Sequence, residues 1–567
     1  MKLPSFSLFV PHVYRAMALS STVLLLLAVQ CAAQNQTVEG TLSTAREVAP
    51  VPRLSTVERV TVREFRFEGN TVFTQAQLAK LMAPYLNREI SAEELEEARR
   101  QLTLHYVNSG FINSGALLKE QPVRDGTITF TIIEGTLTDI KVTGNRHYRT
   151  DYLVEQVSRG VGPPFNLTAA RNTLQVLRQN PNISRINAEV QPGVRPGAAS
   201  LNVAVQEANP YRIALEFDNH RPASIGAERL RLVTSSSNLT GRDDALFLRT
   251  GLTRNGLRQS ALSGQHDLSL TYQSPPSRDN TSFQFNYSKG DAAVIEEPFR
   301  TLDISSRSEN AGIGLRLVPR RTITSEFALT LNLEHRQSTA FLAGQPFSFA
   351  RGDVNGKAQT TALRFGQEWL RRGQTQVFTA RTLVSWGGNF QGSTHNALAP
   401  NGSFLTLLGQ TQYVRLLNNS GRQLILRLSG QWANRPLLSV EQFAVGGANS
   451  VRGYRENQLV RDRGLVTSAE MRVPVLLDRS GRERLSLAPF VDFGYGANIA
   501  TVTSTLPTAT AAPGRDTLSS AGLGVIYTPN RHLNAQLYWG HPLRSFSSPG
   551  GDLQDKGIHF SLVWNLF

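Results

Sequence analysis

The chain divides into two regions that differ in the spacing of their apolar residues. In the first, up to about residue 208, short alternating stretches are interleaved with stretches of helical spacing. Residues 62–67 alternate apolar and polar side chains and lead into Gly69 and Asn70, which indicates a strand followed by a turn. Ser91, with Glu94 three residues later, forms a capping box ahead of apolar residues spaced three or four apart. The pattern predicts mixed strands and helices.

This pattern occurs twice. The first unit is predicted to have a strand at 62–67, helices within 71–85 and 91–110, and strands at 116–121 and 127–133. The second is predicted to have a strand at 138–142, helices near 151–157 and 167–179, and strands around 185–191 and 200–207. The Gly–Asn pair at 69–70 returns at 144–145, which sets the repeat length at 75 residues. A repeat of this kind predicts two domains of the same α+β fold in tandem.

From Tyr211 to Phe567 the helical spacing disappears and a period of two takes over. Segments such as Leu329–Leu333 place polar residues between apolar ones, and turn residues separate the segments. Apolar-out, polar-in alternation predicts a transmembrane antiparallel β-barrel. At about ten residues per spanning strand, plus its loop, this region accommodates about 16 strands. A soluble array of β-sandwiches is the alternative, and the features of the N-terminus argue against it.

The first 33 residues have the features of a secretory signal peptide. Lys2 and Arg15 supply positive charge, 16–29 is apolar, and small residues around Cys31 suit cleavage before Gln34. A lipoprotein signal acylated at Cys31 is disfavoured because Gln30 is large, and the apolar run is too short for a membrane anchor. Residues 34–57 are predicted to be a linker or a short plug segment.

Composition narrows the function. The net charge is +15, but the arginines are spread along the whole chain, which favours a cationic lumen and periplasmic face over nucleic-acid binding. Cys31 is the only cysteine, so the mature chain has neither disulfides nor zinc–thiolate sites. Motifs of hydrolases, nucleotide-binding loops, zinc proteases and calcium loops are missing from the sequence. We therefore expect a protein that is not an enzyme and has no cofactor or metal.

Three segments near the C-terminus are specific. Residues 441–447 read Glu-Gln-Phe-Ala-Val-Gly-Gly and run into Val451, Arg452, Gly453 and Tyr454. Asp462-Arg463-Gly464 then leads to 470–474, and Phe490, Asp492 and Gly494 form a Phe-x-Asp-x-Gly motif. In this order, and behind two repeats, the segments resemble the outer-membrane transporters of two-partner secretion. That is the hemolysin-activator and filamentous-hemagglutinin-transporter family of the Omp85 superfamily. The resemblance covers about residues 60–567.

The resemblance implies an architecture and a candidate site. It implies two POTRA (polypeptide-transport-associated) domains at 58–135 and 136–208 and a 16-stranded barrel at 209–567. A loop at about 446–464 is expected to fold into the lumen, with Gly446 and Gly447 as its hinge. The resemblance also implies that Arg452 at the loop tip pairs with Asp492 of a barrel strand. Such a pair is physically sound, since a guanidinium fits a carboxylate with two parallel hydrogen bonds. A surface ion pair on an ordinary loop is the alternative.

Two features depart from the family. An N-terminal plug helix is doubtful because prolines interrupt residues 34–57. At the C-terminus, Trp564 continues the outward-facing alternation of the last strand, whereas the final Phe567 breaks it. Trp564 and Phe567 are the expected barrel assembly signal. The break leaves open a bulge in this strand or an altered recognition by the assembly machinery.

The functional hypothesis is a translocator in the outer membrane of a Gram-negative bacterium. Its POTRA domains, in the periplasm, would recognise a secreted client such as an adhesin or hemolysin, which the barrel would export. Lipid, lipopolysaccharide, the barrel assembly machinery and periplasmic chaperones are the other expected partners, and nucleic acid is not. The alternative is an Omp85-type insertase for other barrels. A nutrient porin is disfavoured because porins lack such periplasmic repeats.

Overall fold

The computed structural model describes residues 59–567 except 122–124, 254–265, 391, 397–399, 419, 500–513 and 549–550. The predicted signal peptide and the 34–57 segment, including any plug, lie outside the described residues. The described chain forms two compact units, one ending at Asn209 and one beginning at Pro210. Within these residues, no helix has the length and apolar character that crossing a membrane requires.

The first repeat is a small sheet covered by two helices. Its elements are β1 (Arg59–Val62), β2 (Glu64–Glu68), α2 (Gln75–Met82), β3 (Arg88–Ser91), α3 (Ala92–Asn108), β4 (Gly115–Leu117) and β5 (Thr127–Ile133). The sheet order is β2-β5-β4, and alternation in β2 buries Phe65 and Phe67 against Phe130. The predicted capping box of Ser91 and Glu94 is present at the start of α3.

Two details of this repeat differ from the sequence-based expectation. The predicted strand at 62–67 is two short strands, and β1 pairs with β3, a strand that was not predicted. β3 is only four residues long and half of it is charged, so it shows no clear period. The strand predicted at 116–121 is shortened to β4, which ends at Leu117.

The second repeat has the same plan. It consists of β6 (Thr136–Thr143), α4 (Thr150–Ser158), α5 (Leu167–Arg178), β7 (Ile183–Pro192) and β8 (Ala198–Glu207). The sheet order is β6-β8-β7, with the parallel pair β6 and β8 matching β2 and β5 of the first repeat. Leu153, Leu201 and Val203 are buried in its core. All five predicted elements are present within a few residues of their expected bounds.

In each repeat, a glutamate near the end accepts hydrogen bonds from the backbone of the turn that follows β2 or β6. Glu134 accepts hydrogen bonds from the backbone N–H groups of Thr71 at 2.7 Å and Val72 at 2.8 Å, and Glu207 accepts one from Tyr148 at 3.0 Å. Burial acts to raise the pKa of Glu134, but the hydrogen bonds from Thr71 and Val72 outweigh burial and hold that pKa below its usual value. The sequence analysis missed this shared device.

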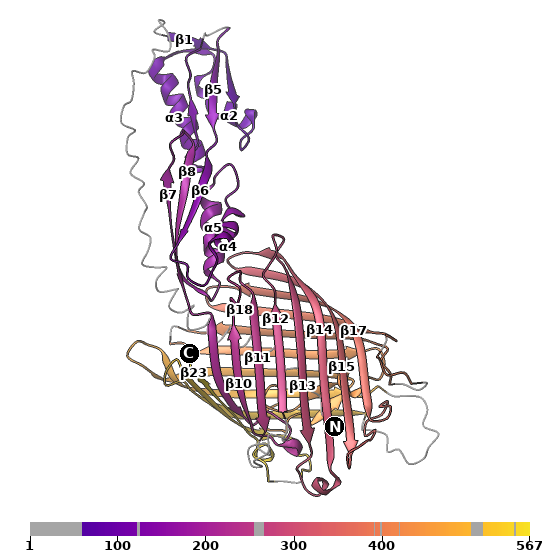
Figure 1. The fold of residues 1–567 in the computed structure, drawn as a ribbon. Coiled ribbons are helices and arrows are strands. Elements are labelled where there is room, and N and C mark those ends of the chain that lie inside the picture. Colours follow the sequence, from indigo (N-terminus) through magenta and orange to yellow (C-terminus); the bar gives the residue numbers. More distant parts are fainter. Residues whose placement is uncertain are drawn as a thin grey trace. The chain divides into compact units, whose positions relative to one another are not determined.

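The second unit is a closed antiparallel barrel of 16 strands, as predicted. The strands are β9 (Tyr211–Asp218), β10 (Arg229–Ser236), β11 (Ala245–Thr253), β12 (His266–Gln273), β13 (Thr281–Ala293), β14 (Ile304–Arg321), β15 (Ser325–Leu342), β17 (Lys357–Arg372), β18 (Gln376–Gly387), β19 (Phe404–Leu416), β20 (Gln423–Ala433), β23 (Arg463–Leu477), β24 (Glu483–Ala497), β25 (Arg515–Tyr527), β26 (Leu533–Pro542) and β27 (Ile558–Asn565). They form a continuous tilted wall (Figure 1). β27 pairs with β9 to close it.

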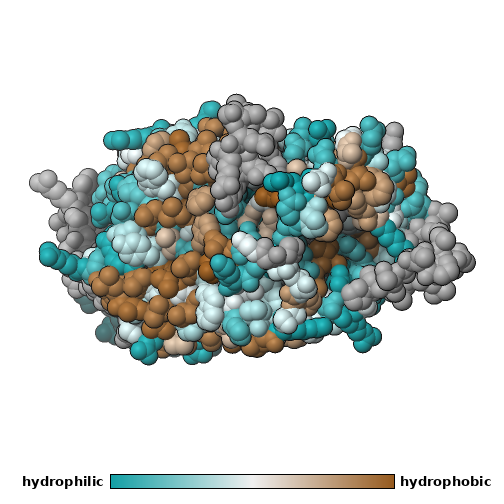
Figure 2. Space-filling model, turned by 90° about the horizontal axis from the view of Figure 1, so that it is seen from below, coloured by the Kyte–Doolittle hydropathy of each residue, from teal (hydrophilic) through white to brown (hydrophobic). Residues whose placement is uncertain are grey.

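Alternation along the strands separates the two faces of the wall. In β19, Leu405 and Leu407 are exposed on the outside, while Thr406 and Leu408 are buried inside. The view onto the barrel from below Figure 1 shows polar and apolar residues intermixed, as expected where strands give way to loops (Figure 2).

The C-terminal strand pairs without a register shift with both β26 and β9. No bulge is therefore present in β27, and the strand ends at Asn565, so the break in alternation at Phe567 falls beyond it. Trp564 is 51% exposed on the outer face.

Candidate functional site in the barrel lumen

The segment between β20 and β23 folds inward as a hairpin. It contains a 3-10 turn at Ser439–Glu441, then β21 (Phe443–Val445) paired with β22 (Leu459–Arg461). This segment differs from the expected loop at 446–464, because it starts directly after Ala433 and Gly464 already belongs to β23. The apolar residues 443–445 read like part of a barrel strand, so the sequence could not show that they leave the wall.

The structure brings the tip residue Arg452 onto Asp492 of β24. Nε and Nη2 of Arg452 lie 2.8 Å from the two carboxylate oxygens of Asp492, and its backbone N–H donates to the same carboxylate at 3.0 Å. Both residues are buried. This is a two-point, fork-like ion pair on a lumen-facing position of the wall, not an exposed ion pair.

Arg452 has further partners that the sequence analysis did not identify. Its Nη1 donates to Glu470 and its Nη2 to Ser468 at 3.1 Å, both on β23. The guanidinium lies 3.6 Å above the ring of Phe490 and 4.9 Å from that of Tyr538. Two carboxylates and two ring faces therefore surround one cation, an arrangement in which cation–π contacts add to the ion pairs.

Glu470 connects this cluster to other lumen arginines. It accepts from Arg472 Nε at 2.8 Å, and Arg427 Nη1 lies 3.6 Å away. Removing one member of a buried charge network leaves another uncompensated, at a cost of about 3–5 kcal/mol. The network thus makes the position of the loop tip sensitive to single substitutions.

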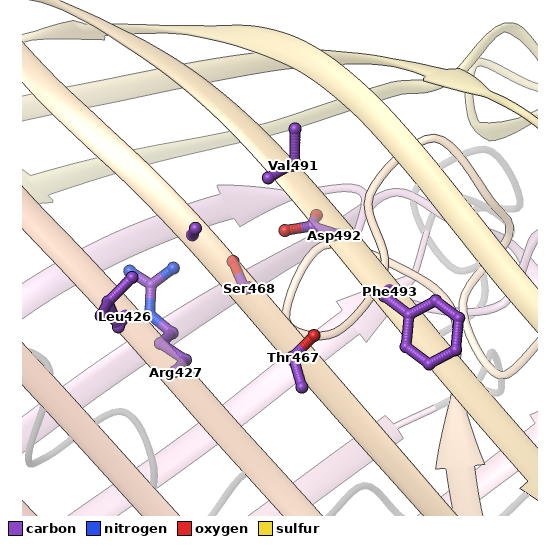
Figure 3. Close-up of a pocket in the computed structure, with 8 residues that line it drawn as sticks. Leu426, Arg427, Thr467, Ser468, Val491, Asp492 and Phe493 are labelled. Carbon is purple, nitrogen blue, oxygen red and sulfur yellow. The ribbon is translucent and has the colours of Figure 1, made fainter.

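Figure 3 shows in close-up the part of the barrel wall around Ser468 and Asp492, where side chains point to both faces of the strands. Ser468 and Asp492 are buried toward the lumen, while Val491 and Phe493 are 56% and 41% exposed on the outside. A shallow depression of about 300 Å³ lies here, also lined by Leu426. The wall at this level is therefore a single strand layer between lipid and the loop anchor.

Glycines let the loop approach the wall closely. Gly453 has φ +90°, and a Cβ there would lie 2.7 Å from the carbonyl oxygen of Gly540 on β26. A Cβ on Gly494 would collide with Val445 and come within 2.7 Å of Cγ2 of Val451. The motif glycines are thus needed for backbone conformation at one position and for space at both.

Tyr454 ties the tip to a different strand. Its hydroxyl lies 2.8 Å from the carbonyl oxygen of Ser519, to which it donates, and accepts from the backbone N–H of Arg544 at 3.2 Å. Gly446 and Gly447 have φ +108° and +106° and follow β21 directly. They begin the tip of the hairpin, so they do not lie where the loop leaves the barrel.

A second buried charge cluster holds the other limb of the loop. Glu441 accepts from Arg364 Nη2 at 2.7 Å and from the Thr360 hydroxyl at 2.8 Å, and Arg336 lies 3.5 Å away. Arg364 and Arg336 also contact Glu334 of β15. The sequence analysis quoted Glu441 within a motif but gave it no role.

Apolar packing fills the space between the two clusters. Phe443, Val445, Val451 and Leu459 of the loop are buried against wall residues that include Leu408 and Leu518. The sequence predicted a polar lumen, whereas the loop brings a cluster of apolar side chains into it beside the two charge clusters. The loop is therefore docked by a small core as well as by charges, which predicts one defined resting position.

Comparisons with known proteins agree with this architecture. The model of the family "Haemolysin secretion/activation protein ShlB/FhaC/HecB" matches residues 197–524, and that of "POTRA domain, ShlB-type" matches residues 60–135. The outer membrane transporter CdiB of Dickeya dadantii (strain 3937) is 26% identical over 411 residues, 71% of this chain and 70% of that protein. The hemolysin transporter protein ShlB of Serratia marcescens is 23% identical over 406 residues, covering 70% and 69%.

Solved structures share the fold. CdiB from Escherichia coli superposes with a TM-score of 0.65 at 21% identity over 100% of both chains. BamA from Haemophilus ducreyi, lacking POTRA domains 1–3, gives 0.52 at 13% identity over 89% of this chain and 100% of that one. The predicted outer-membrane location, with the POTRA domains in the periplasm, is confirmed. The chain belongs to the ShlB/FhaC/HecB family of haemolysin secretion/activation proteins, a family of transporters and not a class of enzymes.

Proposed function

We propose that this two-partner secretion transporter exports its client through the barrel lumen, and that the inward hairpin at 434–462 must leave its resting position for the client to pass. The observation that carries the proposal is the anchoring of the hairpin by Arg452 on β23 and β24. A loop held by buried charges and apolar packing occupies lumen space that an extended client would need. The motif residues 446, 447, 451–454, 490, 492 and 494 act in this view as loop and receptor for one closed state.

We further propose that the first repeat captures the client. β2 is an edge strand of its sheet, so one side of its backbone has no strand partner within the described residues. An extended segment can add to such an edge through main-chain hydrogen bonds. Deleting the repeat, Val60 to Glu134, is expected to abolish secretion while the barrel still inserts in its heat-modifiable form. Normal secretion by this deletion variant would exclude capture by the first repeat.

The remaining partners follow from the location. An outer-membrane barrel contacts lipid and lipopolysaccharide, and we propose that its last strand, with Trp564 and Phe567, is read by the barrel assembly machinery after delivery by periplasmic chaperones. The secreted client is of the adhesin or hemolysin type. Likeness to BamA supports the fold alone, and the match to the secretion family favours export over insertion of other barrels.

The lumen route is tested by site-specific photo-crosslinking during secretion. Ser429 and Leu428 are neighbours on β20 and face opposite sides, with Leu428 43% exposed on the outside. A photoreactive amino acid at 429 is expected to capture the client in transit, and the same group at 428 is the matched control. Client adducts from 428 and not from 429 would place the route outside the lumen.

A further inference from the structure

Three arginines face outward at one end of the barrel wall. Arg320 on β14, Arg371 on β17 and Arg415 on β19 are all exposed. Arg371 lies opposite Phe378 in the register, and Arg320 lies opposite Phe327. Directly opposite residues share a face of a sheet, and both aromatic residues belong to the outward-facing set. A register shift between Leu317 and Arg320 gives Arg320 this face, since strict alternation would have placed it beside the inward Arg316.

A group of aromatic residues lies beside these arginines on the same face of the wall. It comprises Phe327, Trp369, Phe378 and Tyr413. Trp369 is 58% exposed, and its ring centroid lies 5.8 Å from that of Phe327. Aromatic girdles mark the boundary between hydrocarbon and headgroups in membrane barrels. Phe378 and Trp386 both face outward on β18. Eight residues span about 27 Å along a strand, which at a tilt of about 35–45° is about 20 Å of height, comparable to the roughly 25 Å apolar band.

The three arginines lie at the periplasmic end of the barrel. β9 begins and β27 ends at the barrel end that directly follows the periplasmic repeats along the chain. Counting the antiparallel strands from β9, β14, β17 and β19 all terminate at that same end. The three arginines thus lie at the periplasmic side of the girdle, where the hydrocarbon meets the headgroups of the periplasmic leaflet. Trp369 and Tyr413 are two residues nearer the middle of the barrel than Arg371 and Arg415 on the same strands.

The charge environment differs between the two faces of these strands. Inward arginines in this region have carboxylate partners: Arg316 lies 3.0 Å from Glu326 and 3.3 Å from Glu368. Arg320, Arg371 and Arg415 have no carboxylate within ion-pair distance among the residues that the structure describes. The described residues therefore do not neutralise these three outward arginines, and the phosphate of a neighbouring lipid is the group that a guanidinium fits with paired hydrogen bonds.

We propose that Arg320, Arg371 and Arg415 form a binding surface for anionic phospholipid headgroups of the periplasmic leaflet. Their place on the lipid face, next to the girdle, favours lipid over an acidic segment of a client. The inference rests on the outer-membrane location and is independent of the secretion mechanism.

The test measures retained lipid on the purified full-length protein by native mass spectrometry. Phosphatidylglycerol and phosphatidylcholine with identical acyl chains are supplied together in mixed micelles. The variant is Arg320→Gln with Arg371→Gln and Arg415→Gln. The control is Arg479→Gln with Arg482→Gln and Arg531→Gln, which removes the same charge from exposed positions in turns at the same end. Heat-modifiable mobility confirms that each barrel is folded.

The wild type is expected to retain phosphatidylglycerol in preference to phosphatidylcholine. The preference should fall by about fivefold per arginine removed from the girdle, the factor that corresponds to about 1 kcal/mol, and should persist in the control. If both variants lost the lipid preference equally, overall positive charge and not these three positions would explain it, and the proposal would be overturned. A wild type without preference, or a girdle variant that keeps its lipid preference but loses client binding, would overturn it too.

Discussion

Arg452 reaches Asp492 with two side-chain nitrogens and its own backbone N–H, so that one carboxylate fixes both the side chain and the backbone of the loop tip. A lysine cannot reproduce this, because its ammonium has no planar fork. Arg452→Lys is therefore expected to weaken loop docking even though the charge is kept. Single-channel recording should show more frequent opening than in the wild type, and wild-type closure would contradict the fork as the essential feature.

Substitutions of the pair are expected to be unequal. Asp492→Ala leaves Arg452 with Glu470, whereas Arg452→Ala leaves Asp492 without an arginine partner among the described residues and Glu470 with Arg472 and Arg427. Arg452→Ala should therefore impair secretion more. The double variant should be no worse than Arg452→Ala, because coupled residues deviate from additivity by about 0.5–3 kcal/mol. A swap, Arg452→Asp with Asp492→Arg, should rescue only in part, since Gly453 and Tyr454 position the tip for one geometry.

Secretion is compared at equal amounts of heat-modifiable barrel, so that failed assembly is not mistaken for failed export. If the two single defects simply add, the residues do not act as a unit.

Gly494→Ala is expected to displace the hairpin, because the added Cβ would collide with Val445 and approach Val451. Gly409→Ala on β19 is the matched control, since a Cβ there has open space around it. Steady conductance in planar bilayers should rise in the first variant and remain at the wild-type level in the second. A rise in both would point to a general effect of glycine replacement in barrel strands.

Glu441→Gln tests the second anchor. The amide keeps the shape but leaves Arg364 and Arg336 with Glu334 as their one shared carboxylate. Loss of a buried pair costs about 3–5 kcal/mol, so the 434–445 limb should become accessible to proteolysis. Glu368→Gln removes a lumen carboxylate whose partners are Arg316 and Arg381 on the wall. If both variants were cleaved equally, Glu441 would not be a specific anchor of residues 434–445.

The stability of the first repeat is expected to depend on pH through Glu134. The folded-state pKa of this group is lowered, so its contribution is complete above its unfolded pKa and is lost as the pH falls through the folded value. Unfolding of the full chain, followed by a probe in the first repeat, should therefore need less denaturant at acid pH. Glu134→Gln should be less stable at neutral pH and should flatten this dependence; an unchanged slope would exclude Glu134 as its source.

Much of the fold follows from local pattern. The period of two along 329–333 and similar segments, and the helical spacing behind Ser91, identify barrel and repeats because side-chain alternation and capping are local. The pairing of Arg452 with Asp492 was expected only from the resemblance to the family. Alternation tells which face a residue takes but not its level in the barrel.

Which other residues contact Arg452 depends on their level along the barrel, and the strand register sets that level. Ser468 meets Arg452 because it lies opposite Asp492 across β23 and β24. Tyr538 of β26 reaches Arg452, and Arg364 of β17 reaches Glu441 of the hairpin, from strands far away in the sequence. The short strand β3 was missed because four residues cannot display a period.

The central claim is that the hairpin must leave the wall during export, and a reversible tether tests it most directly. Cγ2 of Val451 lies 2.7 Å from the Cβ position of residue 494, so Val451→Cys with Gly494→Cys can link loop and wall once Val445→Ala has removed the Cγ1 atom with which a side chain at 494 would collide. Ala444→Cys with Val460→Cys, opposite each other in β21 and β22, closes a disulfide within the hairpin and leaves it free to move. The account predicts that oxidation stops secretion in the first variant, that reduction restores it, and that the second secretes under both conditions. Full secretion by the oxidised first variant, with the link verified, would contradict the account.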